Sequence, residues 1–377
     1  MIIVKEVATK RDMKKFVSFP VEMYKDCPYY VPAMYGDEIT ILDEKKNYNL
    51  KDAVCKCFLA YKDGKLVGRI AGIYSEVENK TAEKKLVRFS RIDAIDDFEV
   101  FKALIEAVEE FGREKGAELI HGPWGFNDTD REGMLTFGFE EMATYATNYS
   151  YPYYVEHMEK LGFLAESKWV EKKFGIPTEV DERIRNLAPR IEKRLKVVDL
   201  ARTMKVGAIL DKYADEFFET YNESYGVLDG FVKFEGKAKD QLLDSIKMAI
   251  NERYLSFLVD EEGKVAAFGV MLPSMAKALK KTDGKLFPFG FITLLKAINK
   301  PKELEMALIG VKEKYKNSGI TSIIITNIIS NIIEDKIERV ESNPMLETNY
   351  LIQQQWKFLD AEIIKKRQTY IKEIAKA

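Results

Sequence analysis

The chain has 377 residues, which is long enough for two domains of ordinary size. Hydrophobic residues make up 46% and charged residues 32%, and the formal net charge is −2, so a broad basic surface for nucleic acid is not expected. The longest apolar run, 321–333, contains polar residues and is too short to cross a bilayer, and the first apolar stretch is too short for a signal peptide. We therefore expect a cytoplasmic protein with no nucleic-acid and no membrane partner.

Cysteine and histidine are scarce. The three cysteines, Cys27, Cys55 and Cys57, are an odd, small number for a long chain, which indicates reduced thiols. Cys55 and Cys57 alternate in a strand-like run without further ligands nearby, so strand packing is favoured over a metal site. His121 and His157 are the two histidines, and the GxSxG and HExxH motifs are missing. Serine hydrolases and histidine-rich metal enzymes are therefore disfavoured, and no metal is expected.

The first half alternates helical and strand-like segments. A short amphipathic helix and a segment rich in Pro and Tyr come first, and a hairpin follows around Asp63-Gly64. A strand, a long helix capped by Asp96 or Asp97, a strand that ends in a Gly-rich loop, a short helix and a last strand complete the order. The expected segments are 11–19, 27–38, 55–74, 86–95, 98–116, 118–126, 151–163 and 168–176.

The second half repeats this order after a charged, Pro-containing stretch. Two helices precede a hairpin around Glu262-Gly263, a Gly- and Phe-rich excursion and a strand. A loop, a helix rich in Ile, a strand, a short helix and the last strand follow. The expected segments are 208–225, 237–253, 254–274, 277–301, 304–311, 312–320, 321–336, 337–346, 349–358 and 362–374.

Two pairs of segments show an internal duplication. Residues 57–73 align with 256–272 around the hairpin turns, and residues 161–176 align with 356–371 at the last strands. Their order is the same and their separation nearly so, which indicates duplicated domains. We predict one domain over 1–178, a linker over 179–196 and a second domain over 197–377.

This order of elements resembles the GNAT acyltransferase fold. The resemblance implies an α/β protein of two GNAT-like domains, each a mixed, mostly antiparallel sheet flanked by helices. The first half ends as that family does, with Asn148 and Tyr154 before a Gly-Phe turn at Gly162. The second half has Asn349 and Trp356 in the matching places, with Lys357 where Gly is usual.

The loop before the Ile-rich helix resembles the donor loop of GNAT proteins, (Arg/Gln)-x-x-Gly-x-(Gly/Ala). Lys316 and Gly319 match its spacing, and Thr321 replaces the last small residue. Backbone amides and the helix dipole at such a turn hold a pyrophosphate, so this loop is predicted to bind the diphosphate of acetyl-CoA or another acyl-CoA. The predicted donor-loop residues are Lys316, Asn317, Ser318, Gly319, Ile320 and Thr321. By the same resemblance, Ile309, Gly310 and Val311 pair with the pantetheine arm.

The first half lacks such a loop. Asp93, Asp96 and Asp97 cluster where the phosphates would lie, and carboxylates repel a pyrophosphate. The first half is therefore predicted to be a degenerate copy.

Catalytic and acceptor-binding residues are predicted from their places around the donor strand. Glu341 is the expected base and Tyr350 the expected acid, with Asn343 and Asn349 beside the acceptor. A Gly-rich loop in the first half, with a nearby tyrosine, is expected to add substrate contacts through Trp124, Asn127, Asp128 and Tyr154. Surface, capping and packing roles are the alternatives for all of these residues.

The predicted activity is acyl transfer from an acyl-CoA to a small-molecule amine, with the donor site in the C-terminal half. A non-catalytic GNAT-like protein that binds a ligand or partner is one alternative. A Fem-type aminoacyl transferase, which uses aminoacyl-tRNA, is a second, and the missing basic tracts count against it. A homodimer is left open.

Overall fold

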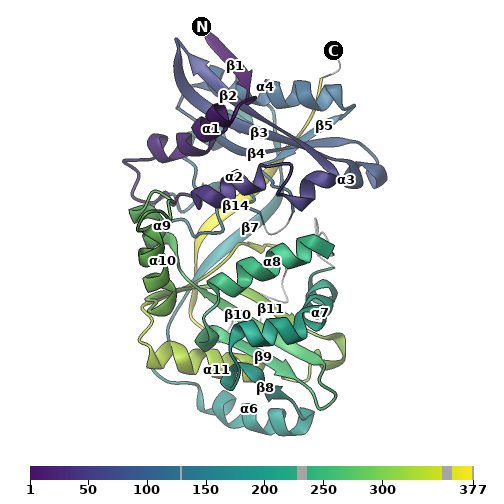
Figure 1. Cartoon of the computed structure of the whole chain (residues 1–377), viewed down its shortest axis with the longest axis vertical. Helices are drawn as coiled ribbons and strands as arrows, with labels where there is room; N and C mark the ends of the chain where they lie inside the picture. The colour runs from purple at the N-terminus through teal and green to yellow at the C-terminus, as the bar shows by residue number, and fades with distance from the viewer. Residues whose placement is uncertain (128–129, 227–235, 350–358, 376–377) are drawn as a thin grey trace.

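The structure is a computed structural model that describes residues 1–127, 130–226, 236–349 and 359–375. It is a mixed α/β protein, as predicted, with the N-terminal half at the top of Figure 1 and the C-terminal half below. The described elements of the N-terminal half are β1 (Ile2–Glu6), α1 (Lys10–Met23), α2 (Tyr35–Ile41), β2 (Ala53–Lys62), β3 (Lys65–Ser75), α3 (Glu76–Thr81), β4 (Leu86–Ala94), α4 (Phe98–Glu114), β5 (Leu119–Gly122), β6 (Met134–Phe137), α5 (Tyr153–Lys160) and β7 (Leu164–Phe174).

The C-terminal half repeats the pattern. Its described elements are α6 (Glu182–Leu195), β8 (Val198–Asp199), α7 (Val206–Tyr225), α8 (Gly236–Ala249), β9 (Leu255–Val259), β10 (Val265–Pro273), α9 (Ala276–Lys281), α10 (Gly290–Asn299), β11 (Glu303–Val311), α11 (Thr321–Glu334), β12 (Arg339–Ser342), β13 (Met345–Leu346) and β14 (Ala361–Glu373). Both expected hairpins form, β2–β3 and β9–β10. The stretch expected to link the domains is largely helix α6, whose Ala188 and Ile191 are buried.

The strands form one sheet in the order β1-β2-β3-β4-β5-β14-β7-β12-β11-β10-β9-β8. The pairs β4–β5 and β11–β12 are parallel, and the other described pairs are antiparallel. The closing strands have changed places: β14 pairs with β5 of the N-terminal half, and β7 pairs with β12 of the C-terminal half. Figure 1 shows these two strands crossing side by side between the halves. Because of this exchange the two halves share one sheet, where the sequence suggested two separate ones.

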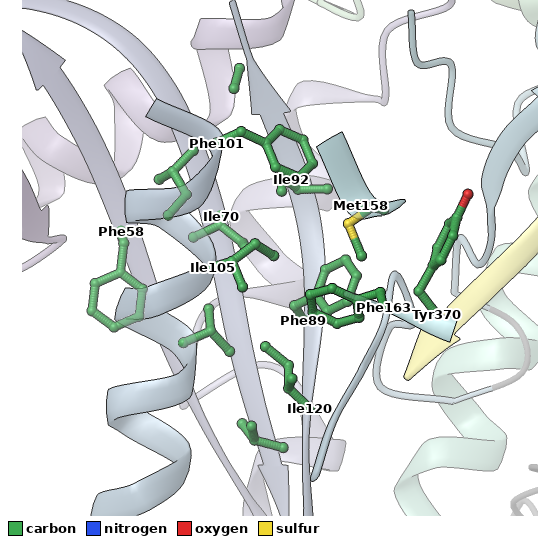
Figure 2. Close-up of a cluster of buried hydrophobic side chains, with 14 of the residues drawn as sticks. Phe58, Ile70, Phe89, Ile92, Phe101, Ile105, Ile120, Met158, Phe163 and Tyr370 are labelled. Carbon is green, nitrogen blue, oxygen red and sulfur yellow. The ribbon is translucent and has the colours of Figure 1, made fainter. Parts of the chain in front are cut away.

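Helix α4 covers the N-terminal part of the sheet. Its Phe101 and Ile105 are buried against Ile70 and Phe89 of the strands, as Figure 2 shows. Tyr370 of β14 joins the same cluster, so the last strand of the chain completes the core of the first half.

Side-chain charges hold the exchanged strands together at the centre of the sheet. The Lys365 ammonium lies 2.9 Å from Glu171 and 3.0 Å from Glu341, and the Arg367 guanidinium lies 2.5 Å from Glu171. Burial raises the pKa of Glu171, but the charges of Arg367 and Lys365 outweigh it and bring the pKa below its usual value. The carboxylate is therefore ionised inside the protein.

Candidate functional site

The strands β11 and β12 separate in the middle of the C-terminal half. They pair in parallel from Glu303 to Met306, and the Asn343 amide then donates to the Met306 carbonyl at 3.2 Å. Beyond that point β11 continues beside β10 alone, with a register shift that leaves Ala307 as a bulge. A bulge bends a strand and alters its twist. A wedge-shaped opening therefore lies between the far half of β11 and the end of β12.

A cavity of about 800 Å³ meets this opening and extends between the two halves. The wall that comes from α8, β10, β11 and α11 is apolar: Ile246, Ala249, Ile250, Val270, Leu272, Leu308, Ile324, Ile325, Ile328, Ile329 and Ile332. The other end of the cavity comes from α2 and loops of the N-terminal half and is polar: Asp37, Thr40, Lys46, Asn47, Asn49, Asn127, Asp130, Arg131 and Glu132. Such a shape accepts a ligand with a long apolar part and a polar end.

Two buried polar atoms on the cavity wall have no hydrogen-bond partner within the described residues. They are the Trp124 indole Nε1, a donor, and the Asn343 side-chain Oδ1, an acceptor. Native proteins seldom leave such atoms unpaired. Both residues were predicted as substrate contacts, and a bound molecule would supply the missing partners.

The carboxylates at the polar end of the cavity differ in their partners: Glu38 and Asp130 face a guanidinium, whereas Asp37 faces a hydroxyl. Arg91 lies 3.0 Å from Glu38 and 3.1 Å from Asp130, so these two are held in ion pairs. Asp37 accepts a hydrogen bond from the Tyr145 hydroxyl at 3.2 Å. Burial raises the pKa of Asp37 above its usual value, although the Tyr145 bond opposes this. A carboxylate of raised pKa on a cavity wall can take up a proton during a reaction.

The predicted donor loop leads into α11 beside the cavity. Ile309 before the loop and Ile324 after it both line the cavity. Gly319 has φ +83°, the left-handed region that favours glycine, and a Cβ there would lie 2.8 Å from the Ile191 side chain. The N-cap residue of α11, Ile320, makes no side-chain cap bond, although the Ser318 hydroxyl accepts from the Ile320 amide at 3.3 Å. The α4 N-terminus differs, because Asp97 accepts from the amides of Glu99 and Val100.

The cations around the donor loop are arranged differently from the expectation. Lys316 lies 2.5 Å from Glu313, so its charge is already paired. Arg194 of α6 donates to the Ser318 carbonyl at 2.5 Å and places a second cation at the loop. Sequence reasoning missed Arg194 because it lies far away along the chain, in a stretch that reads as linker. Asn317 has φ +60°, Ile320 is buried, and Thr321 is the first residue of α11.

The open edge of β11 is occupied by the end of α7. The Ile309 amide donates to the Tyr225 hydroxyl at 3.1 Å, and the Val311 amide donates to the Ser224 hydroxyl at 3.1 Å. A pantetheine arm would take the place of these side chains on the two amides. Gly310 packs against Phe268, whose ring would lie 2.5 Å from a Cβ at that position.

The structure gives no support to Glu341 as the base. Its neighbours Val340 and Ser342 line the cavity, and successive side chains of a strand point to opposite faces. Glu341 is 7% exposed, and its carboxylate accepts from Arg339 at 3.1 Å and from Lys365 at 3.0 Å. It belongs to the buried charge cluster behind the cavity wall.

The remaining predicted residues fall into three groups. Asn127 and Asn349 line the cavity together with Trp124 and Asn343. Tyr154 does not line the cavity, because it is fully buried in the core. Its hydroxyl accepts a hydrogen bond from the Ala94 amide of β4 at 2.8 Å and lies 3.1 Å from the Tyr24 hydroxyl. Asp128 and Tyr350 lie outside the described residues.

The described residues contain no group of three or more His, Cys, Asp or Glu side chains that could hold a metal ion. Within the same ranges no helix has the length and apolarity needed to cross a membrane.

The chain is similar in sequence to two named bacterial proteins. No family model matches the chain. It is 26% identical to "Protein YghO" of Escherichia coli K12, covering 99% of this chain and 95% of that protein. It is also 26% identical to the "Bacterial ceramide synthase" of Caulobacter vibrioides, covering 83% and 81% respectively.

Solved structures agree on the fold. A tandem GNAT protein from the clavulanic acid biosynthesis pathway superposes with a TM-score of 0.58 at 9% identity, covering 100% of both chains. A GCN5-related N-acetyltransferase from Sphaerobacter thermophilus gives a TM-score of 0.51 at 11% identity, covering 100% of this chain and 96% of that one. The chain therefore has a tandem GNAT fold.

Proposed function

We propose that this protein is an N-acyltransferase that moves a long aliphatic acyl group from acyl-CoA to an amine. The observation that carries the proposal is the cavity, whose apolar wall of isoleucine, leucine and valine adjoins the opening between β11 and β12. An acetyl group would leave most of that apolar wall uncovered, whereas an aliphatic chain fills it. Each CH₂ group that leaves water for such a site contributes about 0.8 kcal/mol.

The donor is proposed to lie along the C-terminal half. The start of α11, with Gly319 in the turn and Arg194 beside it, suits the diphosphate of CoA. The pantetheine arm would take the Ile309 and Val311 amides from Tyr225 and Ser224. The thioester then reaches the wedge, and its acyl chain enters the apolar end of the cavity.

The acceptor amine is proposed to enter at the polar end. Its nitrogen attacks the thioester carbonyl, the carbon–sulfur bond breaks, and an amide and free CoA thiol are formed. The nitrogen must lose a proton, and Asp37 is the carboxylate on the cavity wall best suited to accept it. The unpaired Asn343 Oδ1 can accept a hydrogen bond from the same nitrogen, and the Trp124 indole can donate one to an oxygen of the substrate.

The ceramide synthase relative points to the class of acceptor. A ceramide is the amide of a fatty acid with a long-chain amino alcohol, so an enzyme that makes it must accommodate two apolar chains and one polar group. The cavity has this division, with an apolar interior and a polar end rich in Asn, Asp and Arg. We therefore propose a long-chain amino alcohol or a similar lipid amine as acceptor.

A direct test combines the protein with acyl-CoA of increasing chain length and with sphinganine, and follows the amide product and free CoA by mass spectrometry. Long acyl chains should react faster than acetyl-CoA. Asp37→Asn should lower kcat near neutral pH with partial recovery at higher pH, where more of the amine is deprotonated. Absence of any product with all donors and amines would refute the proposal.

The alternative of a non-catalytic binding protein has one observation in its favour, the occupation of the β11 edge by Tyr225 and Ser224. A rise in Tm with palmitoyl-CoA but no amide product would support this alternative.

A further inference from the structure

An apolar surface projects from the segment between β10 and β11. It comprises the loop before α10 and the outer face of that helix, which stands at the side of the molecule in Figure 1. Five large side chains are exposed there by two fifths or more: Phe287 (81%), Phe289 (73%), Phe291 (40%), Ile292 (55%) and Leu295 (51%). We call these residues the phenylalanine patch. Contiguous apolar side chains of this size mark an interaction surface in most folded proteins.

The patch is in excess of what the fold needs. Helix α10 already has an inner stripe, with Ile298 buried and Leu294 packed against a core cluster. The outer stripe of Phe291, Ile292 and Leu295 leaves the helix apolar on both sides. The outer stripe must therefore be covered by something other than the described part of this chain.

Charge indicates what covers it. Lys281, Lys285, Lys296 and Lys300 surround the patch, all are exposed, and none has an ion pair within the described residues. The exposed Asp283 is the one acidic residue between 281 and 300. Exposed aromatic side chains ringed by lysines suit the boundary of an anionic lipid bilayer, where rings enter the acyl region and ammonium groups meet phosphates.

The segment that carries the patch contacts residues beside the polar end of the cavity. The Tyr35 amide at the start of α2 donates to the Gly284 carbonyl at 2.9 Å, and Gly284 packs closely on Ala33. Ala33, Met34 and Asp37 line the cavity. The polar end of the cavity therefore lies close to the segment that carries the patch.

We infer that the phenylalanine patch docks this protein on the surface of an anionic membrane, with the polar end of the cavity near the bilayer. The protein would lie on the membrane without crossing it, in agreement with the absence of a spanning helix in the described residues. The inference goes beyond the proposed function and does not depend on it, although a lipid amine would reach the cavity directly from such a position. It replaces the expectation from the sequence of a protein with no membrane partner.

The test is flotation of the full chain with vesicles of equimolar phosphatidylglycerol and phosphatidylcholine, and with vesicles of phosphatidylcholine alone. We expect binding to the anionic vesicles that weakens with salt. Phe287→Ser/Phe289→Ser should lower the partition coefficient about tenfold or more. The matched control, Leu164→Ser/Val198→Ser, changes two exposed apolar residues elsewhere and should bind as the wild type does.

A charge variant tests the lysines separately. Changing Lys281, Lys285, Lys296 and Lys300 to Gln should lower binding by about fivefold for each residue. Failure of the wild type to float, or equal binding to both kinds of vesicle, would overturn the inference. Light scattering tests the alternative that a second copy of the chain covers the patch. A wild-type dimer that does not bind vesicles, and that Phe287→Ser/Phe289→Ser converts to a monomer, would assign the patch to self-association. Because no step of the test measures catalysis, its result is independent of acyl transfer.

Discussion

Replacement of Glu305 by Gln should make the free energy of unfolding less sensitive to pH. Glu305 lies on β11, is 3% exposed, and accepts a hydrogen bond from the Ser274 hydroxyl at 2.7 Å. In the pairing of β11 with β12, Glu305 lies opposite Glu341. Burial, with the nearby Glu341 charge, raises the pKa of Glu305 from 4.5 to about 7, and the Ser274 bond and Lys365 oppose this only in part.

The sign and size of the pH effect on stability follow from the difference between the pKa of Glu305 in the folded chain and its pKa in the unfolded chain. Below pH 4.5 the carboxyl is protonated in both the folded and the unfolded chain, and its ionisation has no effect on stability. Between pH 4.5 and 7 the unfolded chain loses the proton first, so stability falls as the pH rises, and above pH 7 the loss is complete. Since one pKa unit corresponds to about 1.4 kcal/mol, the wild type should lose about 3 kcal/mol relative to Glu305→Gln between pH 4.5 and 8.

Urea unfolding of both proteins at several pH values measures this difference directly. Any constant effect of the Gln side chain cancels, because only the change with pH is compared. Glu338→Gln, at an exposed glutamate just before β12, is the matched control for the change of residue type. A difference between wild type and Glu305→Gln that stays constant from pH 4.5 to 8 would refute the reasoning and show that Glu305 is ionised in the folded chain.

Three further predictions concern the donor loop, the cavity and the exchanged strands. Gly319→Ala should weaken CoA binding about tenfold in calorimetry, because φ +83° costs an alanine about 1–2 kcal/mol and its Cβ would meet the Ile191 side chain. The control is Gly263→Ala, which has φ +73° in open space and should leave CoA binding unchanged. Ala249→Phe should shift the preferred acyl-CoA to a shorter chain, because the ring enters the cavity, and Ala103→Phe on α4 should not; identical chain-length profiles would contradict the assigned acyl site. Lys365→Met should lower the free energy of unfolding by about 3–5 kcal/mol, because it leaves two buried carboxylates with less compensating charge, and a loss below 1 kcal/mol would contradict the ion-pair assignment.

Local signals in the sequence predicted the hairpins and the long helices, whereas β1, α2, α3, α9 and α10 were not expected. The Asp63-Gly64 and Glu262-Gly263 turns close the two hairpins, and Asp97 caps α4. The Ile-rich segment forms a helix despite its β-branched residues, because its apolar positions follow a helical spacing and its inner face is buried against the sheet.

The exchange of the closing strands could not be predicted in the same way. The segments that form β7 and β14 resemble one another in sequence, so their patterns fit either half equally well. Glu171, Lys365 and Arg367 look like surface residues in the sequence, yet they are buried because they pair with each other across the exchanged strands. Only the pairing itself shows that these charges are internal.

The donor loop stays a prediction from the sequence, and the direction of a side chain is the feature of the candidate site that the sequence indicates least. Gly319 and the start of α11 have the geometry expected of a donor loop. Glu341 points away from the cavity because side-chain direction alternates along a strand, and a register error of one residue reverses it. Asp37 was missed because α2 lies far from the donor loop in the sequence, and only the fold brings it to the cavity.

The strand exchange also gives a structural role to the first half, for which the sequence predicts no donor loop. With β14 completing the N-terminal sheet and β7 completing the C-terminal one, neither half is a closed unit, and their relative position is fixed by a shared sheet. That position places α2 and the loop around Trp124 opposite the opened strands β11 and β12. The N-terminal half thereby supplies the polar end of a cavity whose apolar end belongs to the other half. If the proposed acyl transfer takes place in this cavity, the polar residues of the N-terminal half face the acceptor, and acceptor specificity should be sought there.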